Sequence, residues 1–536
     1  MLGETRAEEW RQRLGDRWRL HLGLIIALWF VLGFVRPIGD PDLPRHLALG
    51  EWIVRHGAVP FAEPWAWTRS GAPFYAYSWL PELMQYGLFR LAEETGLRFY
   101  NAMLVVAAGA SMLLVGAVAR WRPWTVLLLA LLHVGITTIF AGGQRPGLVL
   151  LVTIPIAWWA AYKLLDAPRT APALIAIAAA NIVAANSHIL FPAMLGPLAL
   201  LFTRDRIDWR RLLVAGTVTV ASWLVTPYAL VWPAAFRINF GANPLFSYPT
   251  PIDELTPGFI AITQLRDLLG FLPLCLAFVP WIVAPRLTMR ERVSLGILWL
   301  AGLGMFALAV RGLVIWWVLT LPLTAAAIEM LKEPTRAAVH RSQLVATYLV
   351  VGFLLAGILR VDADTDWTRY SRGPRSLPAP ANPWVEPAAQ WIECNLPNQA
   401  SGRIFNTFDF GDYLAWRLPR YSVSIDGRNI FPDSVALAEG FAVASSGGAP
   451  LGPWRSADLA IVPDIYPVAA ALDSARGWRR VLKSGFTSDS TLTTGLWIRE
   501  GWWARQSALA LPDSVFELDA RSGNSYQCAH EASARR

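Results

Sequence analysis

The feature that most constrains this chain is a series of apolar runs, most of them long enough to cross a lipid bilayer. A helix needs roughly 17–25 residues for the crossing, because the hydrocarbon core offers no partners to free backbone N–H and C=O groups. Spans are predicted at residues 20–35, 99–119, 124–141, 147–162, 171–186, 189–202, 212–232, 268–284, 293–310, 312–330 and 343–359. Only 16% of the residues are charged, against about 25% in soluble domains. The sequence therefore predicts a polytopic α-helical membrane protein of about 11 transmembrane helices.

Basic residues between the spans predict the orientation of the chain. Lysine and arginine accumulate in cytoplasmic loops of membrane proteins. If the tail at 1–19 is cytoplasmic, every inward loop is basic, with clusters at residues 6–19, 120–122, 163–169, 204–211, 286–292 and 332–341. The short outward turns carry single arginines. The net charge of +8 thus reflects membrane topology rather than nucleic-acid binding. The distribution of the basic residues predicts a bacterial inner (plasma) membrane protein with its carboxyl end outside.

Three regions are predicted on the outer side: residues 36–98, residues 233–267 and everything after about 360. The first span has no small-x-small cleavage site after it, so we interpret it as an anchor rather than a signal peptide. Within 36–98, Leu43–Arg55 and Trp79–Leu91 have mixed helical patterns that are too short to span. Such segments are typical of helices lying in the membrane interface.

The carboxyl-terminal part reads as a separate unit that follows the transmembrane domain at 20–360. A proline-rich linker is predicted at 361–383, an α/β domain at 384–500 and an extension at 501–536. Helices are expected at 385–395, 413–418, 434–443 and 467–475, and strands at 403–406, 421–426, 458–462, 478–484 and 491–499. This alternation favours a mostly parallel sheet. Three cysteines, Cys275, Cys394 and Cys528, indicate neither a metal site nor a disulfide framework.

The predicted topology brings polar residues from distant stretches to the outer membrane surface. They are Asp40, Asp42, Arg45, His46, Arg145, Asn186, His188, Glu254 and Arg311. A carboxylate there can deprotonate an acceptor hydroxyl or amine. Arginines can hold a phosphate and stabilise the charge on a leaving group. The set therefore indicates group transfer from a lipid phosphate, and the aromatic residues Trp65, Trp67, Tyr75 and Tyr77 suit a sugar or prenyl surface.

Structural explanations exist for several of these residues. Asp42 precedes Leu43-Pro44 and is a suitable helix N-cap, and lone arginines at span ends often reach toward lipid headgroups. His188 can be a hydrogen-bonded helix-end residue. His133 and Asn181, in mid-span, are expected to bond neighbouring helices. Asp426-Gly427-Arg428 is interpreted as a turn with an internal ion pair.

The motifs of this chain resemble those of the GT-C superfamily of membrane glycosyltransferases, which includes protein O-mannosyltransferases and the transferase that adds aminoarabinose to lipid A. The stretch Asp42-Leu43-Pro44-Arg45-His46-Leu47-Ala48 is similar to the Asp-Glu-x-Arg-Tyr-Ala stretch of that superfamily. The resemblance implies a catalytic carboxylate at Asp42 and donor-phosphate contact at Arg45. It also implies that Trp79–Leu91 is the second juxtamembrane helix.

A fuller resemblance, along nearly the whole chain, is to a bacterial GT-C-like group without an assigned reaction. Its motifs are Asp40-Pro41-Asp42-Leu43, Trp79-Leu80-x-Glu82-Leu83, Arg145-Pro146, Asn186-x-His188, Pro227-Tyr228, Ile252-x-Glu254, Gly411-x-Tyr413-Leu414 and Ile425-Asp426-Gly427-Arg428. Two positions depart from the superfamily pattern. Leu43 replaces the second acidic residue, and Tyr75–Ser78 replaces a Lys-Pro-Pro-Leu stretch.

These observations lead to one principal hypothesis, an inverting transferase that moves a sugar from a polyprenyl-phosphate donor to an extracytoplasmic glycan, lipid or protein acceptor. Asp42 is the expected base with Asp40 second, and Arg45, Arg145 and Arg311 are expected to hold the phosphate. His46, His188 and Glu254 are assigned to acceptor binding or support. The resemblance leaves Mg²⁺, Mn²⁺ or no metal open. A catalytically silent GT-C-like scaffold or assembly subunit, and a transporter of lipid-linked intermediates, are the alternatives.

Overall fold

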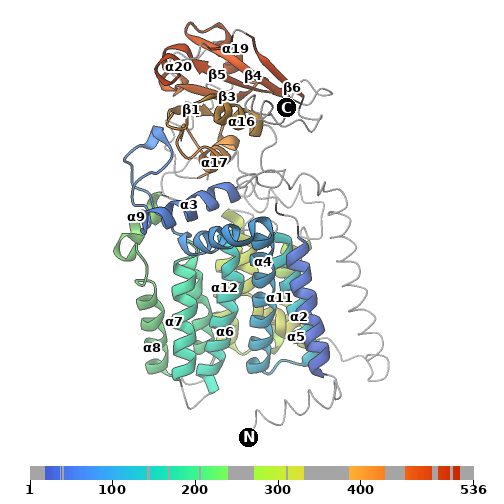
Figure 1. The fold of residues 1–536 in the computed structure, drawn as a ribbon. Coiled ribbons are helices and arrows are strands. Elements are labelled where there is room, and N and C mark those ends of the chain that lie inside the picture. The colour runs from blue at the N-terminus through green and yellow to red at the C-terminus, as the bar shows by residue number, and fades with distance from the viewer. Residues whose placement is uncertain are drawn as a thin grey trace.

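The structure is a computed structural model in which the chain forms a helical bundle capped by a sheet domain (Figure 1). It describes residues 18–36, 38, 42–141, 145–166, 170–204, 207–238, 271–308, 312–330, 385–428, 453–485, 493–507, 511–512 and 514–519. The predicted span at 343–359 lies outside these ranges, so the predicted total of spans stays a prediction.

The bundle contains the helices expected from the apolar runs. They are α2 (Trp18–Val35), α4 (Trp79–Ala119), α5 (Pro123–Ala141), α6 (Leu150–Asp166), α7 (Ala171–Ala185), the 3-10 helix η3 (Phe191–Phe202), α8 (Trp209–Ser222), α11 (Phe271–Val283), α12 (Met289–Leu308), α13 (Leu313–Leu319) and α14 (Leu321–Glu329). Within the described residues, Trp79–Ala119, Pro146–Leu165 and Met289–Leu308 are long and apolar enough to cross a membrane by themselves. Shorter apolar helices accompany them.

Prolines account for two differences between the predicted and observed spans. The predicted span 189–202 forms a 3-10 helix with Pro197 in its interior, since proline removes a backbone donor from the α-helical ladder. The predicted span 212–232 is shorter than expected, because α8 ends at Ser222. Turns follow it, and Pro227 disfavours helical geometry at the preceding residue. A short helix, α9 (Trp232–Phe236), comes next.

Polar side chains inside the bundle bond neighbouring helices, as predicted. The Nε1 of Trp317 on α13 donates to Nδ1 of His133 on α5 over 2.9 Å. The other ring nitrogen, Nε2, lies 2.7 Å from the carbonyl oxygen of Leu151 on α6. The Nε1 of Trp223 donates to Oδ1 of Asn181 over 2.8 Å. His133 and Asn181 therefore stabilise helix packing.

Helices form at both segments that were predicted to lie in the membrane interface. The first is α3 (Leu43–His56), which lies across the end of the bundle and under the sheet domain (Figure 1). The second forms the beginning of α4, which starts at Trp79 as predicted. Non-helical backbone angles at Ala92 and Glu93 kink α4 before it continues as a bundle helix. The second interfacial helix and the second span are thus one kinked element.

The carboxyl-terminal domain contains a mixed six-stranded sheet in the order β2-β1-β3-β5-β4-β6. The strands are β1 (Arg403–Asn406), β2 (Ser422–Val423), β3 (Leu459–Pro463), β4 (Trp478–Gly485), β5 (Thr494–Arg499) and β6 (Phe516–Asp519). The pairs β1–β2, β1–β3 and β4–β6 are parallel, whereas β3–β5 and β4–β5 are antiparallel. The helices are α16 (Glu386–Asn395), α17 (Phe408–Arg417), α19 (Pro467–Ser474) and α20 (Glu500–Gln506).

The sheet departs from the sequence expectation at its later elements. Most of α20 and all of β6 lie in the range 501–536 that was assigned to an extension, yet β6 pairs with β4 and belongs to the sheet. Helix α17 begins at Phe408, earlier than the predicted start at Tyr413. The predicted helix at 434–443 lies outside the described residues.

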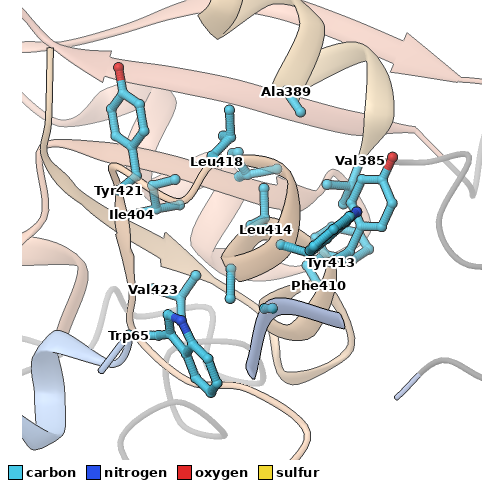
Figure 2. Packing of buried hydrophobic residues seen from close by; sticks show 14 of the residues in the cluster. Trp65, Val385, Ala389, Ile404, Phe410, Tyr413, Leu414, Leu418, Tyr421 and Val423 are labelled. Carbon is cyan, nitrogen blue, oxygen red and sulfur yellow. The ribbon is translucent and has the colours of Figure 1, made fainter. Parts of the chain in front are cut away.

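One hydrophobic core joins the segment between Asp42 and Ser78, called the outer segment below, to the carboxyl-terminal domain. Leu43 and Leu47 of α3 share a buried cluster with Phe410 and Leu414 of α17. The indole of Trp416 packs edge-on against Tyr86 and Phe89 of α4, with ring centroids 6.3 and 5.7 Å apart. Figure 2 shows Trp65 of the outer segment beside Val423 and beneath the α17 residues. Burial of this apolar surface fixes the domain over α3.

Hydrogen bonds strengthen the same contact. The outer segment extends the sheet edge, since the backbone N–H of Val423 donates to the carbonyl of Trp65 over 3.1 Å. The Nε1 of Trp67 donates to the carbonyl of Ile404 over 3.1 Å. Trp65 is only 8% exposed. These two tryptophans, which were expected to suit a ligand surface, instead fasten the outer segment to the domain.

Cys394 of α16 is disulfide-bonded. The chain contains two other cysteines, Cys275 and Cys528. The sequence did not predict a disulfide at Cys394.

Candidate functional site

The candidate site begins at Asp42, the residue immediately before α3. Asp42 occupies the N-cap position, but its side chain accepts no capping hydrogen bond from the helix. Its Oδ2 instead lies 3.4 Å from Nη2 of Arg45, and the Asp42 side chain is 32% exposed. Pro44 in the first turn suits the helix start, where a backbone N–H is not needed. The carboxylate of Asp42 therefore faces Arg45 and does not cap α3.

Arg45 lies between two carboxylates from different parts of the chain. Its Nε donates to Oδ2 of Asp412 on α17 over 3.4 Å, and its Nη2 contacts Asp42. Within the described part of the chain, the third nitrogen, Nη1, has no hydrogen-bond partner. Burial by itself would lower the pKa of Arg45, but Asp412 and Asp42 raise the pKa above its ordinary value. Arg45 is thus a stable cation with one edge held by protein groups.

Asp412 is almost fully buried above Arg45. The backbone N–H of Gly427 donates to Oδ1 of Asp412 over 3.1 Å. A Cβ atom on Gly427 would lie 2.6 Å from Oδ2 of Asp412 and 3.4 Å from Oδ1 of Asp42. Both carboxylates therefore approach the same glycine. Burial raises the pKa of Asp412, although the positive charge of Arg45 opposes this rise.

A second polar group lies one turn along α3. The ring nitrogen Nδ1 of His46 lies 2.7 Å from Oε1 of Glu82 on α4, and both side chains are buried. The hydroxyl of Ser78 donates to the same oxygen over 2.9 Å. Among the described residues, Oε2 of Glu82 has no hydrogen-bond partner. Glu82 therefore sets the orientation of the His46 ring.

The turn that follows Arg145 packs against the ring of His188. Arg145 immediately precedes the 3-10 helix η2 (Pro146–Val149). A Cβ on Gly147 would lie 3.1 Å from Nε2 of His188, so the turn packs directly on this ring. The His188 ring meets Tyr77 edge-on with centroids 6.3 Å apart, and Tyr77 lies within electrostatic range of Arg45. A chain of contacts therefore leads from Arg45 to the Arg145 turn.

Asn186 connects α4 and α7 through hydrogen bonds. Its Oδ1 accepts a hydrogen bond from Nε1 of Trp79 over 2.7 Å, and its carbonyl accepts one from the backbone N–H of Leu80 over 3.2 Å. Its Nδ2 donates to the carbonyls of Ile182 and Val225. Asn186 thus holds the start of α4 against the end of α7.

The Asp426-Gly427-Arg428 turn contains the predicted internal ion pair. The Nε of Arg428 donates to Oδ1 of Asp426 over 2.7 Å, and its Nη2 donates to Oε1 of Glu63 over the same distance. The guanidinium also lies over the rings of Trp65 and Phe74. The turn therefore links the domain to the outer segment and presents Gly427 to Asp412.

The structure brings five of the predicted site residues to one end of the bundle: Asp42, Arg45, His46, Arg145 and His188. Asp40, Glu254 and Arg311 lie outside the described residues. Among the described residues, no group of three or more His, Cys, Asp or Glu side chains could hold a metal ion.

Sequence reasoning missed Asp412 and Glu82 as site residues. Glu82 follows Trp79-Leu80 in a segment that was already identified as an interfacial helix, so a carboxylate among the apolar residues of that helix was an available signal. Asp412 stands at the variable position of the Gly411-x-Tyr413-Leu414 motif. No local signal connects it to Arg45, which is 367 residues away.

Comparison with known proteins identifies the fold. No protein-family model and no curated protein matches the chain. The structure is similar to that of the arabinofuranosyltransferase AftD from mycobacteria, with a TM-score of 0.56 and 16% identity. The match covers 90% of this chain but 41% of AftD, so the chain spans less than half of that protein.

A second similar structure is that of ArnT from Cupriavidus metallidurans bound to undecaprenyl phosphate. Its TM-score is 0.52 with 15% identity, and the match covers 93% of this chain and 100% of ArnT. Both similarities span the bundle and the carboxyl-terminal domain. The chain therefore has the fold of AftD and ArnT, in agreement with the GT-C-like fold that the motifs predicted.

Proposed function

We propose that this chain, which has the GT-C-like fold of membrane glycosyltransferases, moves a sugar from a polyprenyl-phosphate-linked donor to an extracytoplasmic acceptor. The observation that carries the proposal is the pairing of Asp42 with Arg45 at the start of α3, with Arg145 and His188 at the same end of the bundle. Carboxylate and guanidinium groups side by side are the two elements that such a transfer requires.

In this mechanism Asp42 acts as the general base. It takes the proton of the acceptor hydroxyl or amine while the acceptor atom forms a bond to the anomeric carbon. The bond from that carbon to the phosphate oxygen breaks, and its electron pair stays on the polyprenyl phosphate. Arg45 and Arg145 stabilise the resulting charge. Attack opposite the leaving group inverts the anomeric centre.

The remaining predicted residues complete this scheme as proposals. Asp40 is the second carboxylate, Arg311 a further phosphate ligand, and Glu254 a residue of the acceptor side. His46 and His188 support the site, because Glu82 orients one ring and the Gly147 turn packs against the other. The presence of undecaprenyl phosphate in the similar ArnT structure supports a polyprenyl phosphate as the donor lipid.

Two observations support an extracytoplasmic location of the site and the carboxyl-terminal domain. Disulfides form and persist in oxidising compartments outside the cytoplasm, and Cys394 of this domain is disulfide-bonded. The basic inward loops predict the same orientation. We accordingly place the amino end in the cytoplasm of a bacterial cell and the transfer on the outer leaflet.

The proposed function predicts that two single substitutions abolish transfer. Asp42→Asn removes the base, and Arg145→Ala removes a phosphate ligand, so each is expected to lower the transfer rate at least 100-fold, since general-base catalysis and charge stabilisation each contribute about 10²–10⁴ and 10²–10³. The measurement uses membranes containing each variant and labelled polyprenyl-phosphate sugars. Asp473→Asn, on α19 of the sheet domain, is the matched control and should transfer at the wild-type rate. Undiminished transfer by both site variants would refute the proposed site.

One observation favours the catalytically silent scaffold as the second candidate. Leu43 stands where the superfamily pattern has an acidic residue, and it is only 2% exposed within the core shared with the carboxyl-terminal domain. A buried leucine at that position serves packing rather than catalysis. Wild-type membranes that transfer no labelled sugar, from any polyprenyl phosphate offered, would favour this candidate.

A further inference from the structure

The most informative feature that the proposed function does not use is the carboxylate of Asp412. It comes from the carboxyl-terminal domain, 367 residues away from Arg45 along the chain. Its side chain is 6% exposed and that of Arg45 is 14% exposed. A buried carboxylate is costly unless it is paired and hydrogen-bonded. The contact with Arg45 therefore offsets part of this cost.

The planar guanidinium of Arg45 has one edge bound to protein carboxylates, and this fixes the orientation of the whole group. Nε and Nη2 form one edge of the planar group, and they face Asp412 and Asp42, respectively. Because the group is rigid and planar, holding this edge fixes where the remaining nitrogen points. Nη1 has no partner among the described residues. It is the donor left for a ligand oxygen.

The surroundings of Asp412 hold its carboxylate in one orientation. Oδ1 accepts from the backbone N–H of Gly427 and Oδ2 accepts from Arg45. Gly411, the preceding residue, allows α17 to approach the backbone of Ile425 closely. The adjacent Asp426–Arg428–Glu63 network fixes the turn that contains Gly427. Helix α17 and the turn that contains Gly427 together direct the carboxylate of Asp412 toward Arg45 on α3.

We propose that Asp412 is a positioning residue that holds Arg45 beside Asp42 and directs its free edge toward the donor phosphate, so that the carboxyl-terminal domain completes the catalytic centre. This inference rests on the proposed function, because it assigns Arg45 to a lipid phosphate. It gives the domain a part in donor binding, in addition to any contact with the acceptor.

The test measures binding of undecaprenyl phosphate to the purified full chain and to variants, without requiring the sugar or acceptor to be known. Asp412→Asn nearly preserves size, but an amide has a single acceptor oxygen and cannot serve both Gly427 and Arg45. Its dissociation constant is expected to rise about tenfold. Glu393→Gln, which removes one of the two carboxylates paired with Arg417, is the matched control and should bind like the wild type.

Repeating the measurement in an Arg45→Gln variant distinguishes a role of Asp412 in positioning Arg45 from a purely structural role. In the presence of Arg45→Gln, the substitution Asp412→Asn should cause no further loss of undecaprenyl phosphate binding, because the group that it positions is already gone. An equal loss in both backgrounds would overturn the inference. Unchanged binding by Asp412→Asn alone would also overturn it. Tighter binding would do the same, since Asp412 would then be a competitor of the phosphate.

The failure of the proposed function would look different. If the wild type binds no undecaprenyl phosphate, the donor assignment is wrong, and the inference falls with it. The Asp412–Arg45 contact can be measured without any ligand from the unfolding midpoints of the two single variants and the double variant. If the wild type binds the lipid but these midpoints show no coupling, the inference is wrong while the proposed function stands.

Discussion

At the scale of single residues, the site depends on ionisable groups that the fold has withdrawn from water. His46 and Glu82 form a buried pair with Ser78, and Arg45 lies between Asp42 and Asp412. When one ring nitrogen of a histidine is hydrogen-bonded to a buried carboxylate, this bond also sets the orientation and protonation of the other ring nitrogen. The predicted role of His46 as a support residue therefore has a physical basis, which the residue type alone could not provide.

The raised pKa of Asp412 predicts a pH dependence of stability. Charged groups from every side face it: Arg45 and Asp42 on α3, and Asp426 and Arg428 in the turn after β2. Burial raises its pKa above the ordinary value of 3.8. Between pH 3.8 and its native pKa, Asp412 therefore keeps in the native chain a proton that the unfolded chain has released, and above the native pKa it faces Arg45 as a carboxylate. The stability that this protonated group contributes is complete below 3.8 and is lost as the pH rises through the native pKa.

The measurement compares unfolding midpoints of the wild type and Asp412→Asn across this pH range. The midpoint of the wild type should fall relative to that of the variant as the pH rises. Glu393→Gln removes one of the two carboxylates paired with Arg417 at the end of α17 and should follow the wild-type curve. A constant difference between the wild type and Asp412→Asn would contradict the raised pKa.

At the scale of elements, helix α17 carries the contact between the carboxyl-terminal domain and α3. Its approach to the turn after β2 requires a residue without a side chain. A Cβ on Gly411 would lie 2.0 Å from the carbonyl oxygen of Ile425 and 2.6 Å from Cα of Asp426. Both obstacles are backbone atoms, which cannot rotate away. The helix and the turn therefore pack at a distance that only glycine allows.

Gly411→Ala is accordingly expected to destabilise the protein by about 1–3 kcal/mol, the cost of overpacking a close contact. It should also weaken undecaprenyl phosphate binding, because Asp412 would move with the helix. Gly87→Ala on α4, where a Cβ meets nothing within 4 Å, is the control and should be neutral or stabilising by up to about 1 kcal/mol. Equal unfolding midpoints for the two variants would show that the close contact is absent in solution.

At the scale of the whole molecule, one hydrophobic core joins α3 and the start of α4 to the sheet domain, next to the separate core of the bundle. Leu43, Leu47 and Trp65 are buried by residues of the carboxyl-terminal domain. A chain that ends before Val385 would expose this apolar surface to water. We therefore expect the segment between Asp42 and Ser78 to lose its protection from proteolysis when the domain is removed, because local opening follows the loss of buried contacts.

Limited proteolysis of the full and shortened chains, followed by mapping of the cut sites, measures this effect. Cleavage near Arg210 on α8, at the opposite end of the bundle, should proceed at the same rate in both chains. Equal protection of the segment between Asp42 and Ser78 would show that the domain contributes nothing to its order.

Much of the fold was predictable because its signals are local. Apolar runs specify helices in lipid wherever their neighbours lie, and prolines shortened or altered the spans in ways that local rules explain, as at Pro197 and Pro227. The interfacial helices, the strands β1, β3, β4 and β5, and the polar residues near α3 were predicted in the same way. The motif around Asp42 and Arg45 located one half of the candidate site.

The other half depends on contacts between segments that are distant in the chain. The pairing of Arg45 with Asp412 and the insertion of Trp65 against Val423 arise when two apolar surfaces dock. Side chains at such a junction are selected by the partner surface, and no periodicity near either segment encodes that partner. Local patterns therefore established the spans, their order and the character of the site. The docking of the carboxyl-terminal domain established which charges meet there.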